Sequence, residues 1–116
     1  MSMTRREWLS GLVLTGLAGR AAGQGRTVTT LLGTGASGLS DTQVNNPYGL
    51  VFGPDGALYF CDLDNQRIRR FDPASFHVVT VAGNGGRGLS GDGGPAIDAT
   101  LNMPHEIQFD ASGHLY

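Results

Sequence analysis

The chain contains two copies of one sequence segment. The motif Phe-Gly-Pro-Asp-Gly-Ala-Leu-Tyr at residues 52–59 returns 57 residues later as Phe-Asp-Ala-Ser-Gly-His-Leu-Tyr at residues 109–116. A Gly-Leu-Ser segment upstream, at residues 38–40, returns 50 residues later, so the second copy carries seven extra residues within residues 91–100. A repeat of this length is typical of a solenoid, a propeller or an array, in which each unit buries its apolar face against the next.

Four short strands are predicted in the first copy. They are apolar or β-branched segments separated by polar turns, at residues 48–52, 57–61, 67–71 and 77–82. The segment 57–61 is apolar throughout, as expected for a strand that is covered on both faces. Strands of this length and spacing indicate an all-β array, and four strands per repeat is the composition of a propeller blade.

The segments around these strands are predicted in the same way. Residues 27–32 are rich in β-branched side chains and are expected to form a leading strand. After a glycine-rich connection, residues 95–101 are expected to form one helical turn with proline at its first position. The cycle of strands then restarts at residues 105–109 and 114–116.

The first 23 residues have the pattern of an export signal. Arg5 and Arg6 precede an aromatic residue and a leucine, which resembles a twin-arginine signal. The apolar centre at residues 9–19 is shorter than the roughly 20 residues of a membrane span, and small residues precede a cut before Gln24. We therefore expect a periplasmic or secreted protein without a stable membrane anchor, which the export machinery recognises through this segment. The alternative interpretation is an ordinary amphipathic N-terminal helix.

The composition of residues 24–116 excludes several functions. They hold five arginines, no lysine and nine acidic residues. Affinity for nucleic acid depends largely on basic side chains that neutralise phosphates, so nucleic acid is not expected as a partner. The adjacent Arg69 and Arg70 are interpreted as a solvated strand edge rather than an anion site. Cys61, the single cysteine, excludes an internal disulfide and is expected to be buried.

The first copy resembles an NHL repeat. The resemblance rests on Asn46-Pro47-Tyr48-Gly49-Leu50-Val51-Phe52, Asp55-Gly56-Ala57-Leu58-Tyr59, Asp62, Asn65, Arg67-Ile68 and Phe71. The glycine-rich stretch that ends at Pro104 is similar to the linkers between such repeats in many bacterial secreted proteins. The resemblance implies an all-β fold, a β-propeller of NHL repeats that in this family is typically roughly six-bladed when complete.

The resemblance divides the chain into five parts. They are an export signal with its helix at residues 1–23, a closure strand and linker at 24–46, a first complete blade at 47–82, a glycine-rich linker at 83–103 and a truncated second blade at 104–116. A propeller needs at least four blades of roughly 40 residues. The sequence is therefore expected to be the N-terminal piece of a longer protein, with about one and a half blades.

The propeller fold alone does not define an activity, because it hosts many functions. The leading hypothesis is an exported binding or recognition scaffold for a protein, peptide or carbohydrate ligand. The alternative is an exported propeller enzyme, a lyase or lactonase, with a metal in the channel. Histidines or carboxylates at matching positions of other blades would favour the enzyme.

His105 is the candidate metal ligand. Met103-Pro104-His105 resembles the segment of the peptidylglycine amidating lyases in which a histidine binds the channel zinc. The equivalent residue of the first blade is Tyr48, which is not a zinc ligand, so a rim or packing role is the favoured alternative. Glu106 is expected to point elsewhere, since neighbours in a strand alternate in direction. The sequence indicates no cofactor; the alternative is a divalent metal, zinc or calcium, in the complete propeller.

Asp62, Asn65 and Arg67 are predicted to form a structural turn network. Aspartate and asparagine side chains commonly accept hydrogen bonds from nearby backbone N–H groups in turns. Together with Asp64, the same residues form a carboxylate-rich loop, and such loops are the alternative place for calcium.

Overall fold

The computed structural model describes residues 25–116. The chain divides into two compact units, Met1–Leu32 and Gly33–Tyr116. The signal helix expected at residues 1–23, with Arg5 and Arg6, lies outside the described residues. Within residues 25–116, no helix is long and apolar enough to cross a membrane.

The strand predicted at residues 27–32 is not formed. Residues 25–30 have no regular secondary structure, and a bend follows at 31–32. β-Branched side chains favour an extended backbone, but a strand is defined by a ladder of hydrogen bonds to a neighbour. Residues 27–32 belong to no ladder in the described part of the chain, so no leading strand is formed here, and its role in closing a complete ring stays a prediction.

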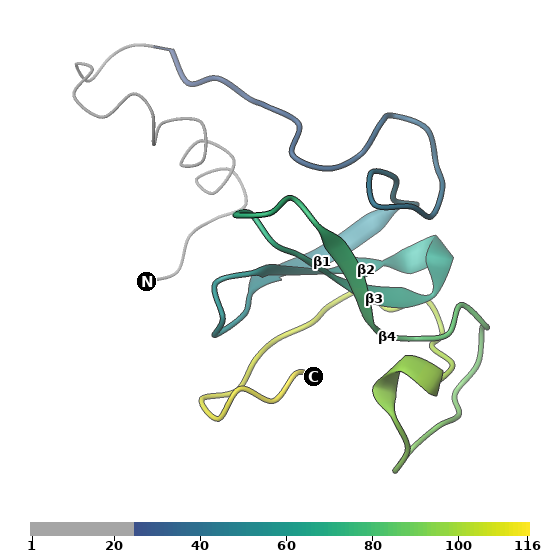
Figure 1. Cartoon of the computed structure of the whole chain (residues 1–116). Coiled ribbons are helices and arrows are strands. Elements are labelled where there is room, and N and C mark those ends of the chain that lie inside the picture. The colour runs from purple at the N-terminus through teal and green to yellow at the C-terminus, as the bar shows by residue number, and fades with distance from the viewer. Residues whose placement is uncertain (1–24) are drawn as a thin grey trace. The chain divides into compact units, whose positions relative to one another are not determined.

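The second unit is built on one four-stranded antiparallel sheet (Figure 1). Its strands are β1 (Pro47–Phe52), β2 (Leu58–Asp62), β3 (Arg67–Phe71) and β4 (Val78–Ala82), and the order in the sheet is the order in the sequence. Each strand begins and ends within one residue of its predicted bounds. A four-stranded meander is the sheet of a propeller blade, and the prediction of an all-β fold is confirmed.

Tight turns hold the strands in register. In the β1–β2 turn, Asp55 Oδ1 accepts a hydrogen bond from the Ala57 N–H at 3.2 Å, and Gly56 takes a left-handed φ of 78°. In the β3–β4 turn, Asp72 Oδ1 accepts one from the Ala74 N–H at 2.8 Å. Between β2 and β3 lies a short 3-10 helix, η1 (Leu63–Asn65).

The linker after β4 contains a second short 3-10 helix, η2 (Ala96–Asp98). Pro95 precedes it in extended conformation, so the predicted helical turn is present but is shorter than residues 95–101. The linker folds back on itself, because Ser90 and Thr100 form an antiparallel bridge. These contacts give the glycine-rich segment a defined path.

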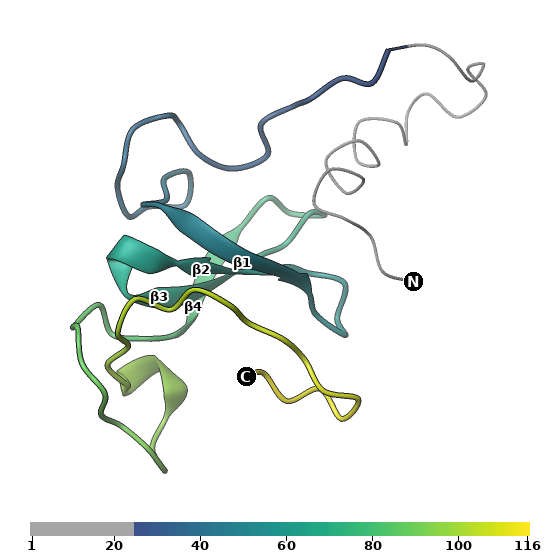
Figure 2. The ribbon, with the colours of Figure 1, turned by 180° about the vertical axis from the view of Figure 1, so that it is seen from behind.

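The second copy packs against the sheet of the first (Figure 2). Ile107 is buried with Cys61 and Ile68 in one apolar cluster. The cluster is flanked by six partly buried side chains, Val51, Tyr59, Val81, Ala82, Leu101 and Leu115. Burial of apolar surface is the main favourable term in folding, so this cluster joins the two copies.

Gly49 permits the two copies to approach closely. Its φ is 51°, and a Cβ on this residue would overlap the backbone oxygen of His105 and lie 2.9 Å from Glu106 Cα. Only glycine lacks the atom that would collide. The register of β1 with β2 is also interrupted between Tyr48 and Val51, so β1 bends where the second copy crosses it.

The second copy forms a hairpin rather than the two predicted strands. Phe109 and Leu115 make one antiparallel bridge, and the backbones of Gln108 and Tyr116 exchange hydrogen bonds of 3.0 and 2.9 Å. The expectation of strands at residues 105–109 and 114–116 was wrong in extent. Two short strands alone are marginally stable, since they lack the neighbouring strands that extend a ladder.

The backbone repeats along with the sequence. Asn46 and Met103, which are 57 residues apart, both have positive φ, at 56° and 50°. Each precedes a proline, which disfavours the right-handed helical conformation in the residue before it. The chain therefore enters both copies through the same unusual backbone bend.

Candidate binding site

A buried ion pair lies beneath the loop that leads into β1. Asp62 is fully buried, and its Oδ2 lies 3.3 Å from Arg69 Nη1. Asp62 Oδ1 accepts a hydrogen bond from the Asn45 N–H at 2.7 Å, and Oδ2 accepts one from Asn65 Nδ2 at 2.8 Å. Both carboxylate oxygens are thus satisfied, which is what a buried charge requires.

Arg69 holds the same loop by two carbonyls. Its Nη1 donates to the oxygen of Gln43 at 2.8 Å, and its Nη2 donates to the oxygen of Ser40 at 2.6 Å. The interpretation of Arg69 as a solvated edge was wrong, because only 3% of the residue is exposed. Arg70 points to the other face of β3 and pairs with Asp55 at 2.8 Å, as the alternation of side chains in a strand requires.

The predicted turn residues belong to one hydrogen-bond network. Asn65 Nδ2, besides its bond to Asp62, donates to the oxygen of Gly38 at 2.8 Å. Arg67 donates from Nη1 to the Asn65 oxygen and from Nη2 to the Asn84 oxygen, both at 3.0 Å. This network of hydrogen bonds extends from the loop before β1 to the linker after β4.

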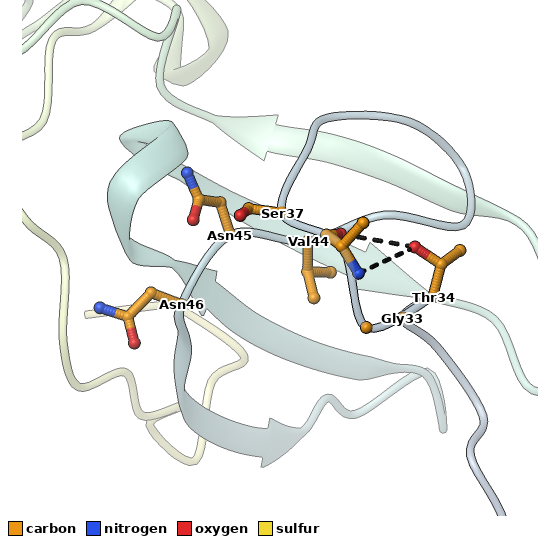
Figure 3. A pocket seen from close by; sticks show the side chains of 8 residues that line it. Gly33, Thr34, Ser37, Val44, Asn45 and Asn46 are labelled. Carbon is orange, nitrogen blue, oxygen red and sulfur yellow. Dashed lines mark hydrogen bonds between the residues drawn. The ribbon is translucent and has the colours of Figure 1, made fainter.

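The loop held in this way lines a pocket of about 250 Å³ (Figure 3). Its lining is formed by Gly33, Thr34, Gly35, Ala36, Ser37, Val44, Asn45 and Asn46. None of these residues carries a charge. Thr34 Oγ1 bonds to the backbone of Ala36 at 3.3 and 3.4 Å, whereas the side chains of Ser37, Asn45 and Asn46 have no hydrogen-bond partner among residues 25–116.

His105 lies against Tyr48, its equivalent in the first copy. The ring centroids are 4.2 Å apart with 31° between the planes. Glu106 was expected to point away, but its Oε1 lies 3.5 Å from His105 Nδ1. Residues 105–106 are not in a strand, so the alternation rule does not apply there. No group of three or more His, Cys, Asp or Glu within residues 25–116 is arranged to hold a metal, and neither His105 nor Asp64 belongs to such a group.

Cys61 lies in the apolar cluster that joins the two copies, and it is fully buried, as expected. Burial, and secondly the negative charge of Glu106, raise the pKa of the Cys61 thiol to about 11. Its Sγ would lie 3.0 Å from a Cβ at Gly49. A thiol in this position remains protonated at neutral pH and is a packing group.

Gln66 is a connection that the sequence reasoning missed. It is buried, has a φ of 54°, and its side-chain Oε1 accepts a hydrogen bond from the Met103 N–H at 2.6 Å. The bond ties the β2–β3 loop of the first copy to the start of the second. No pattern in a single sequence singles out this glutamine, because its partner is a backbone group 37 residues away.

In each copy an aspartate accepts a hydrogen bond from the equivalent tyrosine, but the two aspartates stand at different positions of the repeat. Tyr59 OH donates to Asp55 Oδ2, and Tyr116 OH donates to Asp110 Oδ2, both at 3.2 Å. The tyrosines are equivalent in the repeat, whereas Asp110 aligns with Gly53. The carboxylate has moved by two residues, and the contact is kept.

Comparisons with known proteins agree with this architecture. No known family profile matches the chain. The chain is 32% identical over 77 residues to the protein SUPPRESSOR OF QUENCHING 1, chloroplastic, of Arabidopsis thaliana, a match that covers 66% of this chain and 7% of that protein. It is also 32% identical over 76 residues to NHL repeat-containing protein 2 of Bos taurus, covering 65% and 10%.

The fold of this chain is also similar to that of a solved structure. A structural genomics protein of unknown function from Bacteroides thetaiotaomicron superimposes with a TM-score of 0.58 and 27% identity, over 65% of this chain and 19% of that one. The chain spans a tenth or less of the length of the curated relatives it matches. It is thus similar to an NHL repeat-containing protein over about two thirds of its length.

Proposed function

We propose that this chain is part of an exported NHL-repeat propeller that acts as a binding scaffold. In this proposal residues 47–82 are one blade, residues 104–116 begin the next, and further blades complete the ring. The observation that carries it is the joint between the copies, where Ile107 enters the apolar cluster of the first sheet. The similarity to an NHL repeat-containing protein supports the same assignment.

The binding end of the scaffold is assigned from the topology. In an antiparallel meander, the loop before β1, the β2–β3 connection and the linker after β4 all lie at one end of the sheet. Within residues 25–116, the opposite end carries tight turns: those that begin at Gly53 and Asp72 and, in the second copy, the turn at residues 110–113 beside Pro54. Loops on a rigid scaffold are where binding residues concentrate, so the loop-rich end is the ligand-binding end.

Export is tested by cell fractionation. The protein carries an epitope tag inserted at the exposed residues 91–94 of the linker, and the tag is followed in periplasmic and cytoplasmic fractions. A double variant, Arg5→Lys with Arg6→Lys, keeps the charge but removes the paired guanidinium groups of the twin-arginine signal. We expect the wild-type protein in the periplasm and the variant in the cytoplasm. Equal export of the two would reject the twin-arginine route, and a cytoplasmic wild type would reject export.

A further inference from the structure

The pocket lined by residues 33–37 and 44–46 combines free hydrogen-bonding groups with the absence of charge. The side-chain amides of Asn45 and Asn46 and the hydroxyl of Ser37 have no partner within the described residues. The aliphatic side chain of Val44 also lines the pocket (Figure 3). Amides and a hydroxyl beside an aliphatic surface are suited to a ligand that has both hydroxyl groups and C–H faces.

Side chains of the first sheet and of η1 hold the backbone of the loop around this pocket in place. Arg69 binds the carbonyls of Ser40 and Gln43, Asp62 binds the N–H of Asn45, and Asn65 binds the carbonyl of Gly38. A buried ion pair is weak evidence for stability, because desolvation offsets much of the attraction. Here both charges are used to position one surface loop, and a positioned loop binds a ligand with less loss of conformational freedom.

The size of the pocket restricts the ligand further. Its volume of about 250 Å³ lies just below the range of roughly 300–1,000 Å³ for ordinary small-molecule sites. We propose that this pocket binds one ring of a neutral carbohydrate, with lining side chains such as the Asn45 amide bonded to its hydroxyls and the aliphatic side chain of Val44 beside its C–H face. The inference rests on the proposed binding function and assigns it a ligand class and a place.

The probe is N-acetylglucosamine, a neutral sugar, compared with cationic glucosamine and anionic glucuronate. The full chain, labelled with ¹⁵N, is titrated with each sugar and followed by two-dimensional NMR. We expect saturable shifts of the Ser37 backbone amide and of the side-chain amides of Asn45 and Asn46 with the neutral sugar. Binding of the two charged sugars is expected to be several-fold weaker, because no lining side chain carries a charge that could offset the partial desolvation of theirs.

Two matched variants locate the site. Asn45→Ala removes one amide from the pocket but leaves the backbone N–H that Asp62 holds, and it should weaken binding about fivefold, the value of one hydrogen bond. Asn102→Ala is the control at the equivalent position of the second copy, where the side chain accepts from Arg87 Nε at 2.8 Å outside the pocket, and its binding should be unchanged. Retained dispersion of the β1–β4 amide signals shows that each variant is folded.

The proposal is overturned by any of three results. They are no saturable shift with the neutral sugar, equal or tighter binding of a charged sugar, and equal weakening by both variants. None of these results bears on export, which the fractionation experiment tests separately, so failure of the carbohydrate assignment and failure of the proposed export are distinguishable.

Discussion

The joint between the two copies predicts a specific sensitivity at Gly49. An alanine there would place its Cβ against the backbone oxygen of His105, 2.9 Å from Glu106 Cα and 3.0 Å from Cys61 Sγ. Two of these three neighbours are backbone atoms of the second copy, which cannot rotate away as the end of a flexible side chain does. Gly49→Ala should therefore push the second copy off the sheet.

The expected cost has two parts. The φ of 51° at Gly49 is left-handed, which costs about 1–2 kcal/mol in a residue with a Cβ. Overpacking costs about 1–3 kcal/mol more, so the joint should lose about 2–5 kcal/mol. Gly56→Ala is the matched control, because Gly56 has a φ of 78° but nothing within 4 Å of its Cβ position. Gly56→Ala therefore has the cost of a left-handed φ but no overpacking.

Native-state hydrogen exchange measures the difference. The amides of Gln108 and Tyr116, which bond to each other's backbone, report on the attachment of the second copy. Gly49→Ala should reduce their protection at least about 30-fold, as 2 kcal/mol corresponds to such a factor, whereas Gly56→Ala should act mainly near its own turn. Equal effects of the two substitutions on Gln108 and Tyr116 would refute the close packing at Gly49.

Three further predictions concern single side chains. Asp62→Ala leaves the Arg69 charge buried without its carboxylate and should destabilise the sheet by about 3–5 kcal/mol. The measurement is lost protection of the backbone amides that pair β2 with β3. The exposed Asp64→Ala should change their protection little, and the reverse order would contradict the buried network. Cys61 should react slowly with iodoacetamide at pH 8, because burial raises its pKa to about 11. The unfolded thiol ionises near its ordinary pKa of 9.0. The stability that the buried, protonated thiol contributes is therefore complete below pH 9 and is lost as the pH rises towards 11. Rapid alkylation at pH 8, or constant stability from pH 9 to 11, would exclude a buried thiol. His105→Ala should leave the metal content of the purified protein unchanged, as expected of a residue that packs on Tyr48, and stoichiometric zinc that disappears in the variant would instead support a metal site and the enzyme alternative.

Local patterns predicted the sheet well. Residues 57–61 are apolar and residues 77–82 are mostly β-branched, with turn residues between the strands, and these preferences act within a few residues of the chain. The same reasoning failed at residues 27–32 and 105–109, where the side chains favour a strand. A strand also needs a hydrogen-bonded neighbour, and a single segment does not reveal whether one is present.

The candidate site was predictable only in part. Asp62 and Asn65 were singled out because such residues shape turns near themselves, and they do lie within hydrogen-bonding distance of each other. Arg69 was misjudged, since its partners at Ser40 and Gln43 are 29 and 26 residues away. The pocket is formed largely by backbone and small side chains, which carry no recognisable motif. Its position follows from the fold and not from any local pattern.

The packing of Ile107 into the buried cluster that contains Ile68 tests the central claim most directly. Both side chains are buried in one cluster, although they come from different copies of the repeat. In a protein with selectively labelled isoleucine methyl groups, a nuclear Overhauser experiment should give a cross-peak between these two residues. Absence of that cross-peak, with the signals of the β1–β4 sheet intact, would show that the second copy does not pack on the first and would contradict the assignment of the two copies as successive blades.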